Sequence, residues 1–223
     1  MRLKDRVRAV FEQLRKERPL VQTELEYGSP FQLMVAVVLS AQCTDKRVNM
    51  MTPGLFERYP DAAAMKTAEE EEIFSLISGI TYPRSKARHL IALARKIDEE
   101  YGGRIPDTLA ELKSLPGVGQ KTANVLLSIL FGRKTIAVDT HVYRVSRRLG
   151  LVPLTANTPL KVEQKLMAAV PEEYLADAHH RLLLHGRYTC TARKPKCDEC
   201  GLKECCRYYA DRQRRALRGS GRP

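Results

Sequence analysis

Four cysteines near the C-terminal end of the chain have the spacing of metal ligands. They form a Cys-x6-Cys-x2-Cys-x5-Cys array made of Cys190, Cys197, Cys200 and Cys206. Four thiolates this close along a chain can enclose one metal centre, and tetrahedral zinc and an iron–sulfur cluster both take four such ligands. The spacing itself does not choose between the two, and Cys205 is an alternative fourth ligand.

A glycine-rich turn lies upstream of the cysteines, at Leu115–Lys121, with apolar helical patterns before and after it. Gly117 and Gly119 permit a tight turn that leaves backbone N–H groups at the start of the second helix. Such groups bind phosphate oxygens, with help from the helix dipole. A helix-hairpin-helix of this kind holds one DNA strand by its backbone and reads no sequence. By itself the turn is weak evidence, because most such turns only connect helices.

Lys121 falls in the first turn of that second helix. The positive end of the helix dipole disfavours its ammonium form there, and a neutral amine is what nucleophilic attack on a sugar carbon requires. The alternative is an ordinary surface lysine that serves as a solvated cation.

Asp139 gives Lys121 a chemical context. The segment Val138–Val142 starts a new helix with Asp139 near its N-terminus, where the dipole keeps a carboxylate ionised. An anion at this place can stabilise a developing sugar cation. Asp139 can also simply cap the helix, and the two roles are compatible.

The elements that must position these residues are helical. Apolar residues recur at helical spacing in residues 3–14, and residues 31–42 are apolar nearly all round. Ser85 is expected to cap a long helix that stops at Gly102, and Thr158-Pro159 is a good start for another. The β-like run 135–138 has no partner strand, so the sequence predicts an all-α fold.

The composition favours an anionic partner. The chain of 223 residues holds 38 Lys+Arg against 26 Asp+Glu, a net charge of +12, so nucleic acid is expected first and an anionic membrane second. No secretory signal and no apolar stretch long enough for a bilayer is evident, which predicts a cytoplasmic protein with reduced thiols and no membrane partner. The basic tail, residues 211–223, is expected to be disordered.

Together these motifs resemble the endonuclease III family of DNA glycosylases. The likeness runs through Leu39–Gln42, Leu115–Val125, Val138–His141 and His185–Cys190 into the cysteine array. It implies two helical domains with the active site in the cleft between them. One is a six-helix barrel at 21–133, with the helix-hairpin-helix at about 108–131. The other is a discontinuous iron–sulfur cluster domain made of 1–20 and 134–210.

The resemblance also implies an activity, that of a bifunctional DNA glycosylase and AP lyase that removes oxidised pyrimidines from double-stranded DNA. In that reading Lys121 attacks C1′ of the flipped-out nucleotide as nucleophile, Asp139 assists, and a Schiff base leads to β-elimination on the 3′ side. The partner is DNA with a damaged base or an abasic site, and the protein acts as a monomer. The four cysteines of the array would hold a [4Fe–4S] cluster.

The expected DNA contacts follow from the same resemblance. Gln42 would fill the space left by the flipped base. The segment Gly79–Ser85 departs from the usual family pattern, so Ile80 and Tyr82 are both candidates for the apolar wedge that enters the duplex. The remaining expected contacts come from the hairpin turn, the second domain and the loop between the first two cysteines: Gly117, Val118, Gly119, Lys121, His141, Arg193, Lys194 and Lys196.

Other functions compete with this one. The adenine-removing branch and a thymine-mismatch glycosylase share the scaffold, but Lys121 argues against both. A helix-hairpin-helix protein without catalysis would bind DNA and cleave nothing. A zinc-binding transcription factor would be colourless, whereas an iron–sulfur protein is yellow-brown.

Overall fold

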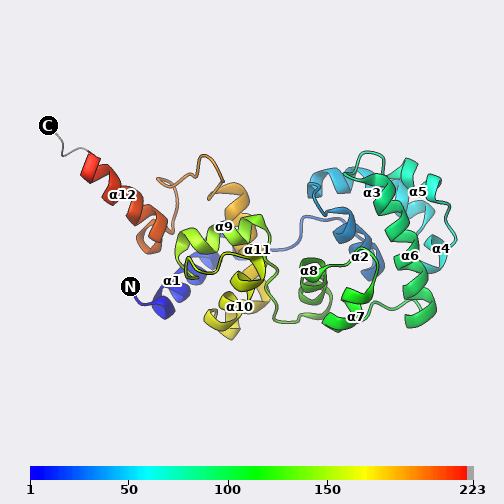
Figure 1. The fold of residues 1–223 in the computed structure, drawn as a ribbon, viewed down its shortest axis with the longest axis horizontal. Coiled ribbons are helices and arrows are strands. Elements are labelled where there is room, and N and C mark those ends of the chain that lie inside the picture. The colour runs from blue at the N-terminus through cyan, green and yellow to red at the C-terminus, as the bar shows by residue number, and fades with distance from the viewer. Residues whose placement is uncertain (220–223) are drawn as a thin grey trace. The chain divides into compact units, whose positions relative to one another are not determined.

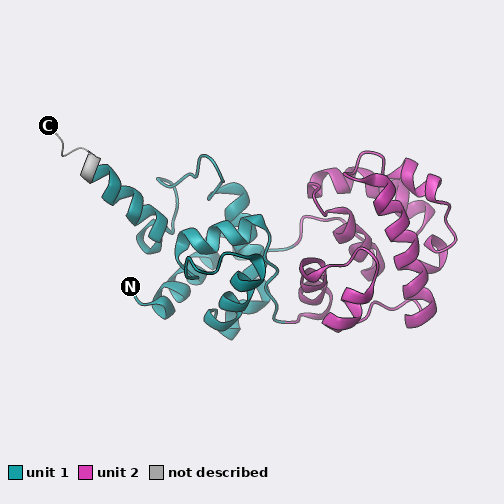
Figure 2. Ribbon diagram, viewed as in Figure 1, with its two compact units in different colours: residues 1–22, 134–223 teal, residues 23–133 magenta. Residues whose placement is uncertain are grey.

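A computed structural model describes residues 1–219, and these residues form helices joined by loops, with no strand among them (Figure 1). The predicted all-α fold is therefore confirmed. The chain divides into two compact units (Figure 2). Unit 1 comprises Met1–Gln22 and Lys134–Pro223, and unit 2 comprises Thr23–Arg133.

Unit 2 is built around one buried helix. Eight of the ten residues of α2 (Pro30–Leu39) are buried, because its sequence is apolar on every side. Ser29 caps it by accepting a hydrogen bond from the N–H of Gln32, and Pro30 occupies the first turn. The other helices of unit 2 are α3 (Asp45–Arg58), α4 (Ala62–Met65), α5 (Glu70–Leu76), α6 (Pro83–Tyr101), α7 (Leu109–Ser114) and α8 (Gln120–Phe131).

Unit 1 joins the first helix of the chain to its second half. The helix α1 (Leu3–Glu17) buries Val7, Val10, Phe11 and Leu14, one face at helical spacing. It packs against α10 (Pro159–Ala169) and α11 (Glu172–Tyr188). The remaining elements are α9 (Thr140–Leu149), the short 3₁₀ helix η1 (Lys203–Cys205) and α12 (Arg207–Gly219).

Two contacts explain why α1 belongs to unit 1. The ring of Phe11 stacks on Tyr174 of α11, with 5.5 Å between ring centroids. Arg181, which is 4% exposed, donates from Nη1 to the carbonyl of Leu14 at 3.1 Å and from Nη2 to that of Pro19 at 3.1 Å. Both contacts join residues more than half the chain apart.

The structure corrects three local expectations. The helix α6 begins at Pro83 and not after Ser85, because proline is well suited to the first helical position, and Tyr82 is its N-cap. The helix α2 ends at Leu39, before residue 42. The prediction of a disordered tail is wrong for residues 211–219, which continue α12. Residues 220–223 lie outside the described residues.

The composition of α12 and the contacts of its first turn explain why the tail is helical. Arginine, alanine, glutamine and leucine are good helix formers and make up most of the segment. The N–H of Tyr209 donates to Cys206 Sγ at 3.4 Å, and the guanidinium of Arg148 lies over the ring of Tyr208 at 4.7 Å. These contacts fix the start of α12 on unit 1.

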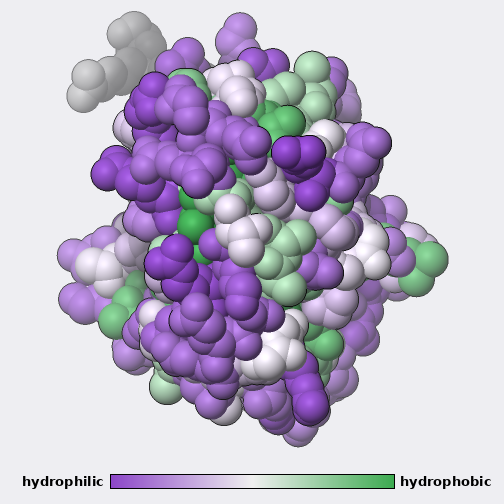
Figure 3. Space-filling model, turned by 90° about the vertical axis from the view of Figure 1, so that its right-hand side faces the viewer, coloured by the Kyte–Doolittle hydropathy of each residue, from purple (hydrophilic) through white to green (hydrophobic). Residues whose placement is uncertain are grey.

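The end of unit 2 shown in Figure 3 is covered mostly by hydrophilic side chains, with scattered apolar ones. Within the described part of the chain, every helix is too short or too polar to cross a bilayer.

Candidate functional site

In unit 2, α7 and α8 are joined by the tight turn that the sequence predicted. Gly117 has φ +79°, and a Cβ there would lie 3.3 Å from both His89 Cβ and Val38 Cγ1, so the turn requires glycine at this position. Gly119 is the N-cap of α8 and offers no side-chain acceptor to the first N–H groups of that helix. An anion can therefore bind where these groups point.

Lys121 is exposed in the first turn of α8. It forms no hydrogen bond or ion pair with any residue that the structure describes, so its amine is available to a ligand. Val118 is 7% exposed and belongs to the buried apolar residues.

Two further loops of unit 2 carry predicted DNA contacts. Gln42 is exposed in the loop between α2 and α3. Tyr82 is 63% exposed just before α6, whereas Ile80 is 3% exposed and packs in the core. Of the two candidates for the wedge, the structure therefore presents Tyr82 to solvent and buries Ile80.

In unit 1, Asp139 is the N-cap of α9. Its Oδ1 accepts a hydrogen bond from the N–H of Val142 at 2.8 Å, so the capping role expected as one alternative is present. His141 follows in the first turn, and its Nδ1 lies 3.1 Å from Arg144 Nη2. A Cβ on Gly186 would lie 2.9 Å from His141 Cβ, so glycine lets α11 approach α9 at this point.

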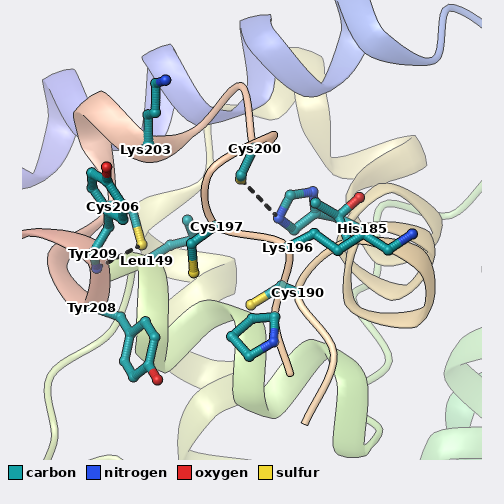
Figure 4. A pocket seen from close by; sticks show the side chains of 12 residues that line it. Leu149, His185, Cys190, Lys196, Cys197, Cys200, Lys203, Cys206, Tyr208 and Tyr209 are labelled. Carbon is teal, nitrogen blue, oxygen red and sulfur yellow. Dashed lines mark hydrogen bonds between the residues drawn. The ribbon is translucent and has the colours of Figure 1, made fainter. Parts of the chain in front are cut away.

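The four cysteines of the array line one small pocket of unit 1 (Figure 4). Cys190 follows α11, Cys197 and Cys200 lie on the loop beyond it, and Cys206 precedes α12. The neighbouring Cys205 does not line the pocket, because its thiol donates to the carbonyl of Leu202 at 3.3 Å. The structure thus brings together the four cysteines of the predicted pattern and leaves the alternative ligand outside.

The four cysteines of the pocket are a donor set typical of zinc sites and of iron–sulfur clusters. No three His, Cys, Asp or Glu side chains in the described part of the chain are placed to hold one metal ion. A zinc ion needs its four sulfurs about 2.3 Å from one point, whereas four sulfurs around a cluster of several metal atoms stand farther apart.

The surroundings of the thiols disfavour their ionised form. Burial raises the pKa of Cys200 to about 11, and burial together with the neighbouring cysteines raises the pKa of Cys206. Nearby cationic metal would favour the thiolates that this environment otherwise disfavours. Burial lowers the pKa of His185 to about 4, so its ring is neutral near pH 7, 3.8 Å from Cys200 Sγ.

Sequence reasoning missed two arginines that hold the cysteine loop. Arg144 Nε donates to the carbonyl of Cys190 at 3.0 Å, and Arg148 donates to Cys190 Sγ at 3.5 Å. Arg148 also binds the carbonyls of Thr191 and Ala192, at 2.7 and 2.8 Å. The available signal was their spacing of four residues on α9, which puts both on one face of that helix.

The loop after Cys190 presents its charges to solvent. Arg193, Lys194 and Lys196 are all exposed. The carbonyl of Lys194 accepts a hydrogen bond from Thr191 Oγ1 at 2.6 Å, and the N–H of Lys196 donates to the carbonyl of Thr189 at 3.0 Å. The loop is thus tied at its base while its cationic side chains remain free to meet phosphates.

Known proteins resemble this chain over most of its length. Residues 35–172 match the family described as HhH-GPD superfamily base excision DNA repair protein. Endonuclease III of Treponema pallidum is 48% identical over 92% of this chain and 98% of its own length. Endonuclease III of Escherichia coli is 44% identical over 89% of this chain and 93% of its own.

Solved structures agree. A trapped covalent intermediate of endonuclease III with DNA, in an estranged-adenine complex, matches with a TM-score of 0.89 at 42% identity. The match covers 96% of this chain and 100% of the endonuclease III chain in that structure. The chain therefore belongs to the endonuclease III family, within the HhH-GPD superfamily of base excision DNA repair proteins.

Proposed function

We propose that the protein is a bifunctional DNA glycosylase and AP lyase that removes oxidised pyrimidines from double-stranded DNA. The observation that carries the proposal is Lys121, an exposed and unpaired amine directly after the turn of a helix-hairpin-helix, in a chain of this family. The hairpin supplies backbone donors for the DNA strand, and the lysine supplies a nucleophile beside them.

The proposed reaction starts when the damaged nucleotide is rotated out of the stack. The neutral amine of Lys121 attacks C1′, the bond from C1′ to the base breaks, and the base leaves with the bonding pair. The ring then opens to a Schiff base between Lys121 Nζ and C1′. Loss of a C2′ proton and departure of the 3′ phosphate cut the strand, and water releases the lysine.

Asp139 has the electrostatic role in this scheme. Its carboxylate is held at the N-terminus of α9 by a hydrogen bond from the Val142 N–H. An anion there would stabilise positive charge on the sugar as the base departs, and could carry a proton between steps. His141, in the first turn of the same helix, would contact DNA.

The pocket residues Cys190, Cys197, Cys200 and Cys206 would hold a [4Fe–4S] cluster. The cluster would cross-link the chain and would take no part in the reaction at the sugar. By fixing the ends of the loop 191–196, these cysteines would set Arg193, Lys194 and Lys196 toward DNA phosphates. Gln42, Tyr82 and the backbone of Gly117–Gly119 would provide the contacts from unit 2.

Borohydride trapping tests the nucleophile. Wild type, Lys121→Ala and Lys113→Ala would each be incubated with a duplex holding one thymine glycol, and with a duplex holding one abasic site. Lys113, an exposed lysine of α7 in the same hairpin, is the matched control. We expect a covalent protein–DNA adduct with wild type and Lys113→Ala on both duplexes, and none with Lys121→Ala.

The pattern of adducts separates the alternatives. No adduct of wild type on either duplex, with DNA binding intact, would overturn the lysine mechanism and leave either a non-catalytic DNA-binding module or a glycosylase without lyase activity. An adduct only on the abasic duplex would support the lyase activity and show that thymine glycol is not the damaged base that the protein removes. An adduct with Lys121→Ala equal to wild type would remove Lys121 from the role of nucleophile.

The proposal includes the setting in which the protein acts. It would work as a monomer in the cytoplasm, associated with nucleoid DNA through its net charge of +12. Equilibrium sedimentation with and without duplex DNA tests the oligomeric state.

A further inference from the structure

Two residues of unit 2 other than glycine adopt a left-handed backbone, and no others do so in the described chain. Gln42 has φ +56° in the loop between α2 and α3, and Tyr82 has φ +56° at the start of α6. Long side chains rarely adopt this conformation, and it persists only where the surroundings hold it in place. The contacts around these two loops therefore carry information about their role.

The carbonyls on both sides of Gln42 are bound by residues from the second loop and the helix that follows it. Lys86 Nζ donates to the carbonyl of Ala41 at 2.7 Å, just before Gln42. Thr81 Oγ1 donates to the carbonyl of Gln42 itself at 2.9 Å. The unusual backbone of Gln42 is thus fixed from outside its own loop.

Lys86 is an unusual lysine because it is 6% exposed and forms no ion pair with the described residues. Its ammonium also donates to the carbonyl of Leu39, the last residue of α2, at 2.8 Å. The last carbonyls of a helix lack partners within the helix, and the negative end of the dipole favours a cation there. Burial lowers the pKa of Lys86, because its ammonium group loses contact with water. The hydrogen bonds to the two carbonyls offset this loss.

Lys86 also contacts the second loop. Its backbone N–H donates to the carbonyl of Tyr82 at 3.1 Å, in the first turn of α6. A third tie comes from α3, where Arg47 Nε donates to the carbonyl of Gly79 at 2.9 Å. One residue therefore touches both loops, through its side chain on one and its backbone on the other.

We propose that Lys86 is a positioning residue that fixes Gln42 relative to Tyr82, so that the two side chains enter a DNA duplex together at one lesion. The proposal rests on the proposed function, which gives these two residues their contact with DNA. Loops that are already held in the binding conformation lose less freedom when DNA binds. The benefit should therefore appear at damaged sites, where both side chains insert, and not on undamaged duplex.

The test uses duplexes with and without a tetrahydrofuran abasic analogue, with 2-aminopurine as the base opposite it. Affinity reports binding, and 2-aminopurine fluorescence reports unstacking of the opposite base. The variants are Lys86→Met, Thr81→Val and Thr81→Ser, which retains the hydroxyl. The matched control is Lys66→Met, because Lys66 pairs with Asp98 near the other end of α6, about 18 Å along the helix from Lys86.

For Lys86→Met we expect about tenfold weaker binding to the abasic duplex, since two charge-assisted hydrogen bonds are lost. Binding to undamaged duplex should stay within about twofold of wild type, because surface charge contacts are unchanged. The rise in 2-aminopurine fluorescence on binding should be smaller than with wild type. Thr81→Val should weaken binding to the abasic duplex in the same way, to a smaller extent. Thr81→Ser should behave as wild type. Lys66→Met should leave the preference for abasic over undamaged duplex unchanged.

The proposal is overturned if Lys86→Met keeps wild-type discrimination and fluorescence. A loss of discrimination in Lys66→Met equal to that in Lys86→Met would do the same, since the effect would then reflect general destabilisation. If Lys86→Met does not fold, the Thr81 pair decides, and equal behaviour of Thr81→Val and Thr81→Ser overturns the idea. A wild type with no preference for the abasic duplex would instead sink the proposed function.

Discussion

At the scale of single residues, the choice between two adjacent cysteines is the most direct test of the metal site. Cys206 lines the pocket with three other cysteines, and Cys205 instead donates to the carbonyl of Leu202. If the proposed cluster is bound, Cys206→Ser should lose its visible absorbance and its iron, because the cluster would lack its fourth thiolate. Cys205→Ser should keep both and lose less than about 1 kcal/mol of stability, since serine preserves the donor.

Iron and sulfide analysis of the two purified variants, beside wild type, checks this prediction. Equal iron in both variants would exclude Cys206 as a required ligand. Zinc in place of iron, in a colourless wild type, would replace the cluster with a tetrahedral site.

The same scale shows what the sequence could and could not reveal. Lys121, Asp139 and the four cysteines could be proposed from the sequence because their chemistry is carried by residue type and short spacing. Lys86 and Arg144 were not, since their partners lie far away in the chain. The bond from Lys86 to Leu39 joins residues 47 positions apart, and the bond from Arg144 to Cys190 joins residues 46 apart. The spacing of Arg144 and Arg148 shows that they share a face of α9, but no local pattern shows which distant residue either Arg144 or Lys86 contacts.

At the scale of elements, the loop 191–196 connects the cysteine pocket to a cationic surface. Neutralising Arg193, Lys194 and Lys196 to glutamine should weaken DNA binding and flatten its dependence on salt. Each lost phosphate contact reduces the slope of log K against log salt by about 0.9. The measurement is binding to duplex DNA across a salt series.

A control removes the same charge elsewhere in unit 1. Lys4, Lys161 and Lys165 are exposed on α1 and α10, outside the loop. Their triple glutamine variant should keep the wild-type slope within about one unit. If both triple variants lose the same slope, the loop has no special place in the interface and net charge alone sets the affinity.

Element boundaries were less predictable than element types. Thr158 caps α10, as its pairing with Pro159 suggested, by accepting from the N–H of Lys161. Ser85 was a poor guide to the start of α6, because Pro83 fixes the first turn and a left-handed Tyr82 enters it. The helical tail was missed since arginine-rich sequence reads as solvated chain, whereas contacts at Tyr208 and Tyr209 start the helix.

At the scale of the whole molecule, the two units have their own cores and should respond separately to loss of the metal site. In Cys206→Ser, amide hydrogen exchange should accelerate in residues 189–217, where the pocket fixes the chain. Exchange in unit 2, residues 23–133, should stay at the wild-type level, because local opening follows local contacts.

Hydrogen exchange with mass spectrometry, with Cys205→Ser as the matched variant, measures this. Faster exchange spread evenly over both units would contradict the prediction and show that the chain unfolds as one cooperative body. Unchanged exchange everywhere in Cys206→Ser would mean that the pocket holds its shape without metal.

The pairing of α1 with the second half of the chain has a consequence during synthesis. The apolar face of α1, with Phe11 at its centre, leaves the ribosome before its partner Tyr174, which follows more than 160 positions later. Unit 2 can fold in that interval, while α1 must wait with its apolar face uncovered. Cys206 emerges later still. The newborn chain is therefore expected to need shielding at its first helix, and to complete the proposed metal site only after Cys206 has been made.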